Sequence, residues 1–341
     1  MIYFSQSEFS RAQDLLSYSH ENLNRSYYLY LPDSLSAGAS LVFVLHGYTG
    51  SAEGIMNYSN MNAIANENKF AVCYPQGTSD NDNNAFWNVG YAFHSDQTVN
   101  DVGFINELAD YLQTEHNLSR NNTFSTGMSN GGDFSYLLAC QSSDVFCAIA
   151  PVAGTMMKWI YESCEPLEPL PVLEIHGTND DVTLWEGDYN NSDGWGEYVD
   201  INSIIELWRD LNYCNFLTTD TLDNINTSDG SYVITEKYEN CIYDNQVWLY
   251  KVVNGGHDWP GAYGNMDINA SAEVWNFFEQ NMHNEILGDV NFDQKIDIQD
   301  LLHIGDQGLN NSEYYYLFDF NEDSEIDVYD LFAISAFLLG F

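Results

Sequence analysis

Short apolar runs alternate with longer amphipathic segments along most of the chain. The apolar runs have the length of buried strands, at residues 27–31, 41–45, 70–74, 122–126, 148–152, 172–175 and 247–252. The segments with helical spacing of apolar residues are 54–68, 99–117, 132–141, 201–211 and 274–280. This alternation predicts an α/β fold with a doubly wound, mostly parallel sheet and helices on both faces. In such a fold, functional side chains gather at the carboxyl ends of the strands.

The pattern changes after residue 284, where the chain becomes strongly acidic and contains an internal repeat. The segment 289–300 is echoed by the segment 319–330, at an offset of 30 residues. We therefore expect two domains, a large α/β domain of residues 1–284 and a small α-helical domain of residues 285–341.

Each repeat places oxygen-bearing groups at the spacing that a hard cation requires, at loop positions 1, 3, 5, 7, 9 and 12, with position 7 contributing its carbonyl. The expected ligands are Asp289, Asn291, Asp293, Lys295, Asp297 and Asp300 in the first loop, and Asp319, Asn321, Asp323, Glu325, Asp327 and Asp330 in the second. The repeats differ from EF-hands, which carry Glu at position 12 and Gly at position 6. We expect two structural Ca²⁺ sites, and no cofactor for catalysis.

The charge of the chain limits its partners. It has 51 acidic and 9 basic residues among 341, a formal net charge of −42. Such a charge repels phosphate backbones and anionic lipids, so we expect no nucleic acid and no membrane partner. Residues 1–20 lack the apolar core of a signal peptide, and we expect an extracellular protein whose leader is not visible in this sequence.

The six cysteines are compatible with an exported, disulfide-bonded protein. Cys73 lies inside an apolar run, so we expect a buried thiol there. Cys214 and Cys241 flank a polar insertion, and a disulfide between them would close a segment with little core of its own. The sequence leaves open how the remaining three are paired: Cys140, Cys147 and Cys164.

The segment Gly127-Met-Ser129-Asn-Gly131 stands between an expected strand and an expected helix. In that context G-x-S-x-G predicts a nucleophile elbow, because the glycines leave room for the sharp turn that exposes the serine. A serine hydroxyl needs a base to take its proton and an acid to orient that base. Asp180 and His257 follow Ser129 in the order that α/β-hydrolases use.

Other residues compete for these roles. Asp181 is an alternative to Asp180, because the spacing alone does not separate them. His46 and His176 also end strands, but each precedes a glycine, where histidine often bonds to loop backbone. We interpret both as structural residues rather than as the base.

The transition state of ester hydrolysis needs donors for the developing oxyanion. We expect them to be the backbone N–H groups of Tyr48 and Asn130, with Thr49 as the alternative to Tyr48. Four tryptophans near the motifs could stack on a feruloyl ring or a sugar: Trp87, Trp185, Trp195 and Trp259. Among them, Trp87 and Trp259 are the candidates for substrate binding.

In combination, the motifs resemble the polyhydroxybutyrate depolymerase and feruloyl esterase group of secreted carbohydrate esterases, which have the α/β-hydrolase fold. The resemblance spans roughly residues 25–283. It implies ester hydrolysis by Ser129, Asp180 and His257 on feruloyl or acetyl groups of plant xylan, or on short-chain polyesters. The motifs are Leu45-His-Gly-Tyr48, Tyr74-Pro-Gln-Gly77, Trp87-Asn88, Asp101-Val-Gly-Phe104, Thr126-Gly-Met-Ser-Asn-Gly-Gly132, Ala150-Pro-Val-Ala-Gly154, His176-Gly-Thr-Asn-Asp180 and Gly256-His-Asp-Trp-Pro-Gly261.

Residues 285–341 resemble a dockerin, the calcium-dependent module that binds cohesins on scaffold proteins. The resemblance implies a cohesin-type partner. Positions 10 and 11 of the loops are Ile298-Gln299 and Val328-Tyr329, where dockerins often carry a pair such as Ser-Thr, so cohesin binding stays open.

The leading hypothesis is thus a secreted serine esterase acting on plant cell-wall esters. A polyester depolymerase is the alternative within the same class. A catalytically inactive binding or scaffold component is the alternative from a different class.

Overall fold

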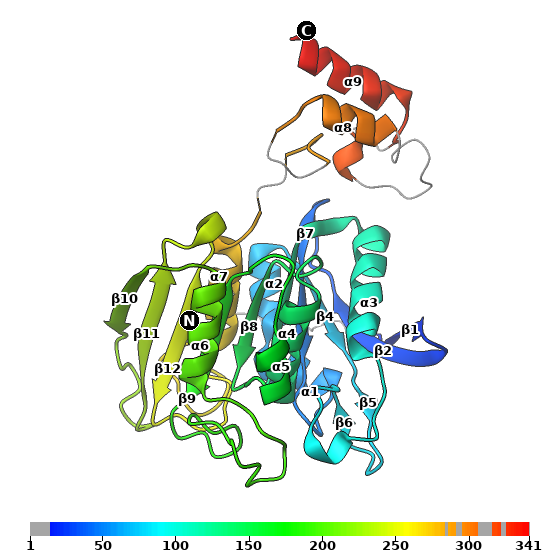
Figure 1. Cartoon of the computed structure of the whole chain (residues 1–341). Helices are drawn as coiled ribbons and strands as arrows, with labels where there is room; N and C mark the ends of the chain where they lie inside the picture. Colours follow the sequence, from blue (N-terminus) through cyan, green and yellow to red (C-terminus); the bar gives the residue numbers. More distant parts are fainter. Residues whose placement is uncertain (1–13, 284–285, 291–294, 306–315, 322–324, 341) are drawn as a thin grey trace, which may run out of the picture.

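One sheet of ten strands, in the order β1-β2-β4-β3-β7-β8-β9-β12-β11-β10, forms the centre of the computed structural model (Figure 1). The structure describes residues 14–283, 286–290, 295–305, 316–321 and 325–340. The strands β4, β3, β7, β8, β9 and β12 are parallel, and antiparallel strands complete both edges. The bounds are β1 Leu16–His20, β2 Leu23–Tyr30, β3 Ala39–Leu45, β4 Ala71–Pro75, β7 Leu118–Met128, β8 Ala148–Val152, β9 Val172–Gly177, β10 Phe216–Thr221, β11 Tyr232–Glu239 and β12 Val247–Val253.

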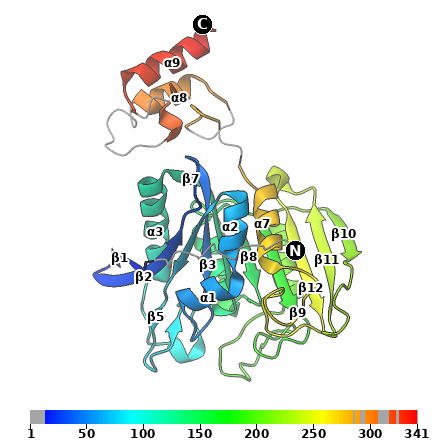
Figure 2. The same ribbon diagram turned by 180° about the vertical axis from the view of Figure 1, so that it is seen from behind.

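Helices cover both faces of this sheet (Figures 1 and 2). One face carries α3 Asp101–His116, α4 Asn130–Gln141, α5 Lys158–Ser163 and α6 Ile201–Leu211. The other carries α1 Ala52–Ser59, α2 Met61–Asn68 and α7 Ala270–Gln280. A separate hydrophobic cluster fills each interface, as a doubly wound sheet requires. The predicted α/β class and the mostly parallel sheet are confirmed.

The helix expected over 54–68 is two helices in the structure. Asn60, with φ 51° and ψ 31°, ends α1 and begins α2. Asparagine tolerates this left-handed conformation better than most residues. The apolar spacing continues across the break, so the pattern alone could not reveal it.

The polar insertion between Cys214 and Cys241 extends the sheet. It forms β10 and β11, which pair antiparallel and attach to β12. The expected Cys214–Cys241 disulfide closes this hairpin. A second disulfide joins Cys140 to Cys164, and Cys73 is a buried free thiol as expected.

The C-terminal repeats each lead into one helix, α8 Ile298–His303 and α9 Val328–Leu339. With a short 3₁₀ helix, Tyr316–Phe318, these helices form a hydrophobic cluster of their own. Asp297 and Asp327 begin the two helices with the same capping box. The domain boundary at residue 284 and the dockerin resemblance stay predictions. Within the described residues, no helix is long and apolar enough to cross a membrane.

Candidate active site

Ser129 stands at the turn between β7 and α4. Its backbone has φ 57° and ψ −124°, a conformation that costs about 1–3 kcal/mol for a residue with a side chain. Its N–H donates to the carbonyl of Val152, and its own carbonyl accepts from Asp133 N. These bonds hold the strained turn and leave the side chain partly exposed at the carboxyl edge of the sheet.

The glycines around Ser129 are required by close backbone packing. A Cβ on Gly131 would lie 2.3 Å from the carbonyl oxygen of Leu45, and one on Gly127 would lie 2.6 Å from the carbonyl carbon of Gly131. A Cβ on Gly47 would lie 3.3 Å from Ser129 Cβ, which places the loop after β3 against the nucleophile. The G-x-S-x-G motif therefore forms the elbow that the sequence predicts.

His257 lies in the loop after β12, and Asp180 lies in the loop after β9. His257 Nδ1 and Asp180 Oδ2 are 2.7 Å apart, with the Asp180 side chain fully buried. A carboxylate can only accept, so Nδ1 carries the proton and Nε2 is left with its lone pair. This is the tautomer that a general base needs.

The structure also separates Asp180 from Asp181. Asp180 Oδ1 accepts the N–H groups of Val182 and Thr183, at 2.9 and 2.8 Å, which fixes its orientation toward His257. Asp181 is exposed. The geometry therefore favours Asp180 as the partner of His257.

Ser129 and the Asp180 loop meet at one cavity. Val182 and Thr183, which follow Asp180, line the same cavity as Ser129. In this conformation no hydrogen bond joins the Ser129 hydroxyl to His257. Such bonds are often long without substrate and tighten when it binds.

The N–H groups of Tyr48 and Asn130 have no acceptor among the described residues. Thr49 N–H, by contrast, donates to the carbonyl of Ala85 at 2.8 Å, so it is not free for a ligand. The Asn130 side chain is also fixed, because it bonds to both the N–H and the carbonyl of Trp87. The geometry therefore favours Tyr48 over Thr49 as the first oxyanion donor.

His46 is a structural residue, as expected. Its Nδ1 donates to the carbonyl of Gly47 at 2.8 Å, and its Nε2 accepts from Gly77 N–H at 2.9 Å. Burial lowers the pKa of His46 to about 4, so the imidazole is neutral at neutral pH.

His176 is buried behind the Asp180 side chain. Its Nδ1 lies 2.9 Å from Glu174 Oε1 and its Nε2 lies 2.9 Å from the carbonyl of Thr183. The Thr183 carbonyl can only accept, so Nε2 carries a proton, and Nδ1 shares a proton with Glu174, whose pKa burial also raises. Burial opposes a positive charge on the ring, but the hydrogen bond and the charge of Glu174 outweigh it and raise the pKa of His176. Nε2 lies 3.6 Å from Asp180 Oδ2.

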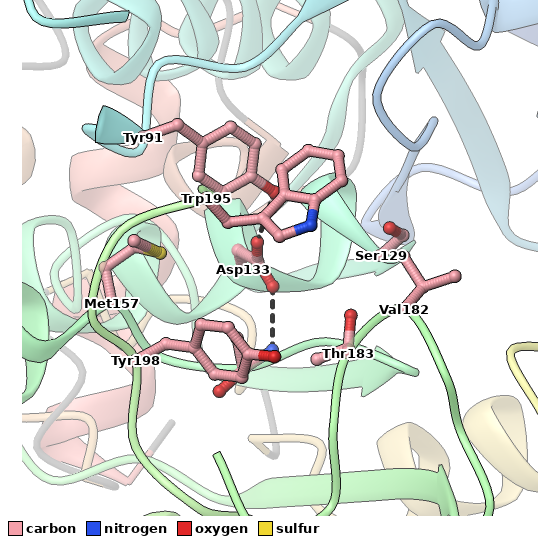
Figure 3. Close-up of a pocket in the computed structure, with 9 residues that line it drawn as sticks. Tyr91, Ser129, Asp133, Met157, Val182, Thr183, Trp195 and Tyr198 are labelled. Carbon is pink, nitrogen blue, oxygen red and sulfur yellow. Dashed lines mark hydrogen bonds between the residues drawn. The ribbon is translucent and has the colours of Figure 1, made fainter. Parts of the chain in front are cut away.

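The cavity beside Ser129 is small, with a volume of about 20 Å³. Figure 3 shows the side chains around it: Tyr91, Ser129, Asp133, Met157, Val182, Thr183, Trp195 and Tyr198. We call it the acyl chamber. Its buried carboxyl, Asp133, accepts from Thr155 N–H at 2.7 Å and lies 2.6 Å from the Tyr91 hydroxyl. Burial raises the pKa of Asp133 to about 7.

The sequence did not identify Tyr91, Asp133 or Tyr198 as site residues. Asp133 had one available signal, its position one helical turn after Ser129 on the same helix. Tyr91 and Tyr198 belong to loops, and their approach to Ser129 depends on tertiary folding alone.

The prediction that Trp87 and Trp259 bind substrate is corrected. Both side chains are buried, 0% and 1% exposed, and each uses its indole N–H internally. Trp87 donates to the carbonyl of His46, and Trp259 donates to Ser271 Oγ. Neither can contact a substrate in this structure. Trp195 is the tryptophan that lines the chamber.

The expected calcium ligands belong to the C-terminal repeats, and the structure describes only some of them. Asn291, Asp293 and Asp323 lie outside the described residues. In the part of the chain that is described, no group of three or more His, Cys, Asp or Glu side chains is arranged to hold a metal ion.

Comparison with known proteins agrees with the fold. Residues 25–186 match the family model described as esterase PHB depolymerase. The chain is 22% identical over 260 residues to the bifunctional acetylxylan esterase/xylanase XynS20E of Neocallimastix patriciarum, covering 76% of this chain and 34% of that protein. It is 30% identical over 135 residues to poly(3-hydroxyalkanoate) depolymerase C of Paucimonas lemoignei, covering 40% and 32%. It is 28% identical over 181 residues to feruloyl esterase B of Piromyces equi, covering 50% and 31%.

The chain thus spans about a third of the length of these three relatives. The acetyl xylan esterase from Aspergillus awamori superposes on it with a TM-score of 0.54 at 14% identity, covering 78% of this chain and 99% of that one. At 14% identity, the superposition shows only that the two proteins share a fold.

The sheet order, the serine at a strained strand-to-helix turn and the structural match show an α/β-hydrolase-like fold. Residues 25–186 are similar to the esterase PHB depolymerase family, and two of the relatives named above are an acetylxylan esterase and a feruloyl esterase.

Proposed function

We propose that the protein is an extracellular serine esterase that removes acetyl or feruloyl groups from plant xylan, with Ser129 as nucleophile, His257 as base and Asp180 as the acid that orients it. The observation that best supports this proposal is the 2.7 Å contact between His257 Nδ1 and Asp180 Oδ2, beside the cavity that Ser129 lines. The curated relatives support the substrate class, since two of those named above are an acetylxylan esterase and a feruloyl esterase.

The proposed reaction follows from these positions. His257 Nε2 takes the proton of Ser129 as Oγ attacks the ester carbonyl, and the N–H groups of Tyr48 and Asn130 stabilise the oxyanion. The intermediate collapses when His257 returns that proton to the leaving alcohol oxygen, and an acyl-enzyme remains. A water molecule, deprotonated by the same imidazole, then releases the carboxylic acid and restores the serine.

The size of the acyl chamber favours a short acyl group. About 10–15 Å³ of such volume holds one water molecule, so about 20 Å³ holds little more than a methyl group. A feruloyl ring would require Trp195 or Tyr198 to move. We therefore propose acetyl as the preferred acyl group, with feruloyl as the other cell-wall candidate.

A comparison of three substrates tests this proposal. We expect kcat/KM for acetate release from acetylated xylan to exceed ferulate release from feruloylated xylan at least tenfold, because the chamber holds only a small group. Hydroxybutyrate released fastest from polyester film would instead support a depolymerase. No turnover of any ester would support the inactive scaffold component.

We also propose that residues 285–341 bind two Ca²⁺ ions through the loop positions named above. Four carboxylates of the repeats are almost fully buried, at 1%, 0%, 3% and 0% exposure: Asp289, Asp300, Asp319 and Asp330. Asp300 accepts the N–H groups of Val290 and Asp297, and Asp330 accepts those of Asn321 and Asp327. Bound cations would compensate further for the cost of burying such charges. An all-oxygen donor set of this kind fits calcium, which would offset the repulsion among the acids.

We propose a cohesin-type scaffold protein as the partner of the C-terminal residues. The exposed residues that begin the two helices differ from the usual recognition pair: Ile298 and Val328 are 58% and 46% exposed. Binding to a panel of cohesins, with and without calcium, would test this part of the proposal.

A further inference from the structure

A second and larger cavity, of about 350 Å³, adjoins the acyl chamber. Trp195 lines both cavities. Tyr48 also belongs to both parts of the site, because its N–H is the proposed oxyanion donor and its side chain lines the larger cavity. An ester bound at Ser129 with its acyl group in the small chamber must direct its alcohol elsewhere, and this cavity is the neighbouring space.

The apolar wall of the larger cavity is a rigid group of aromatic rings. Tyr48, Phe93 and Trp195 lie with ring centroids 5.5–5.7 Å apart in tilted or edge-to-face contacts. Phe93 is 45% exposed although it is a large apolar residue. Because the rings hold one another in place, little conformational entropy is lost when a ligand packs on them.

The polar lining of this cavity contains both acceptors and donors, since the amides of Asn81 and Gln97 lie among its carboxylates. The carboxylates of Asp82 and Asp193 are exposed beside the aromatic wall. His94 is 3% exposed and its Nε2 contacts Asp80 Oδ2 at 3.1 Å, so Nε2 carries the proton and Nδ1 is an acceptor. Nδ1 is buried and has no hydrogen-bond partner among the described residues, an arrangement that costs about 1–3 kcal/mol until a donor pairs with it.

Asp80 keeps this wall in place. It accepts from the Tyr48 hydroxyl at 2.7 Å and from the N–H groups of Asp82 and Asn84, each at 2.9 Å. The same carboxylate contacts His94, so one buried group orients the aromatic and the polar parts of the cavity together.

The chemistry of the wall identifies the ligand class. A polyester segment offers carbonyl acceptors, which pair with the amide N–H groups of Asn81 and Gln97, but it has no donors for the carboxylates of Asp82 and Asp193. An acidic sugar would be repelled by the two carboxylates. A neutral sugar satisfies both halves of the wall, because its hydroxyls donate and its C–H faces pack on aromatic rings.

We propose that this cavity is a subsite for a neutral glycosyl unit, which carries the alcohol side of the scissile ester. The proposal rests on the esterase function proposed above and adds the residues that select a sugar as the alcohol. Phe93 supplies the stacking face, and the exposed carboxylates of Asp82 and Asp193 supply acceptors for the sugar hydroxyls.

The test compares a substrate that has a sugar with one that lacks it. For full-length wild type, Phe93→Ala and Asp193→Asn, kcat/KM is measured on acetylated xylotriose and on 4-nitrophenyl acetate. We expect the ratio of the two values to fall at least tenfold in Phe93→Ala and severalfold in Asp193→Asn. Phe216→Ala is the matched control, because Phe216 is a 57% exposed phenylalanine on the distant strand β10, and its ratio should stay within twofold of wild type.

An unchanged ratio in Phe93→Ala overturns the subsite, while wild-type turnover of 4-nitrophenyl acetate would leave the esterase proposal standing. Absence of that turnover in wild type would instead contradict the esterase proposal. Calorimetric titration with unacetylated xylotriose tests the subsite without any catalytic step. We expect Phe93→Ala to bind xylotriose about tenfold more weakly than wild type does. Equal binding by both proteins would also overturn the subsite.

Discussion

Three buried carboxyl groups, Asp133, Glu174 and Asp180, differ in their hydrogen-bond partners. Asp180 faces His257 and two backbone N–H groups. Glu174 faces the Tyr136 hydroxyl at 2.8 Å and His176 at 2.9 Å. Asp133 faces the Tyr91 hydroxyl and a backbone N–H, with no cationic side chain in hydrogen-bond contact. Burial raises the pKa of Glu174, and it raises the pKa of Asp133 to about 7.

The raised pKa of Asp133 predicts a pH-dependent stability. Between about pH 4 and pH 7 the folded protein holds a proton that the unfolded chain has lost, so the free energy of unfolding falls as pH rises, by about 1.4 kcal/mol per pH unit from this group. Asp133→Asn mimics the protonated form and should remove that slope. Urea unfolding at pH 5 and pH 7 measures the difference between the two proteins.

Asp144→Asn, which changes an exposed carboxylate, is the control for this measurement and should keep the wild-type slope. An equal pH dependence in wild type and Asp133→Asn would show that Asp133 is ionised in the folded protein throughout this range.

The sequence identified Ser129, Asp180 and His257 as candidates because their chemistry demands particular residues at strand ends in a fixed order. It could not identify Tyr91 or Tyr198, whose position depends on how loops fold back over the sheet. It placed Trp87 and Trp259 wrongly for a related reason. Closeness to a motif along the chain does not reveal the direction of a side chain, and both indoles point into the interior.

The strands of the central sheet could be predicted because continuous apolar runs are typical of parallel strands buried on both faces. The hairpin of β10 and β11 could not, since every residue of β10 is exposed and its composition is that of a loop. The break at Asn60 was also hidden, because a single left-handed residue does not interrupt the apolar spacing.

The β10–β11 hairpin should depend on its disulfide. The Cys214–Cys241 bond spans 27 residues with few buried side chains on β10, so its removal raises the entropy of the unfolded chain. We expect the double variant Cys214→Ser, Cys241→Ser to lose about 3 kcal/mol of unfolding free energy, measured by urea denaturation. Cys147→Ser, which changes a cysteine outside both disulfides, is the comparison and should lose less. Equal stability of the double variant and wild type would contradict this role.

The whole molecule combines a net charge of −42 with acidic repeats at its C-terminal end. Repulsion of this size destabilises a compact state and is reduced by salt and by bound cations. The proposed calcium sites would therefore matter most for residues 285–341, whose hydrophobic cluster is small and separate from the two clusters of the sheet.

Removal of calcium should affect the C-terminal residues alone. We expect chelation with EDTA to reduce the helical circular dichroism contributed by α8 and α9 and to leave turnover of 4-nitrophenyl acetate within twofold. Restoration by Ca²⁺, and not by Mg²⁺ at the same concentration, identifies the ion. A large loss of turnover on chelation would mean that the catalytic residues depend on the calcium loops.

The central claim is that His257 activates Ser129 as the nucleophile. Its most direct test is covalent labelling with a fluorophosphonate, located by peptide mass spectrometry in wild type, Ser129→Ala and His257→Ala. We predict one label per chain on Ser129 in wild type, none in Ser129→Ala, and labelling slowed by several orders of magnitude in His257→Ala. A label on another residue, or unchanged labelling without His257, would contradict the account.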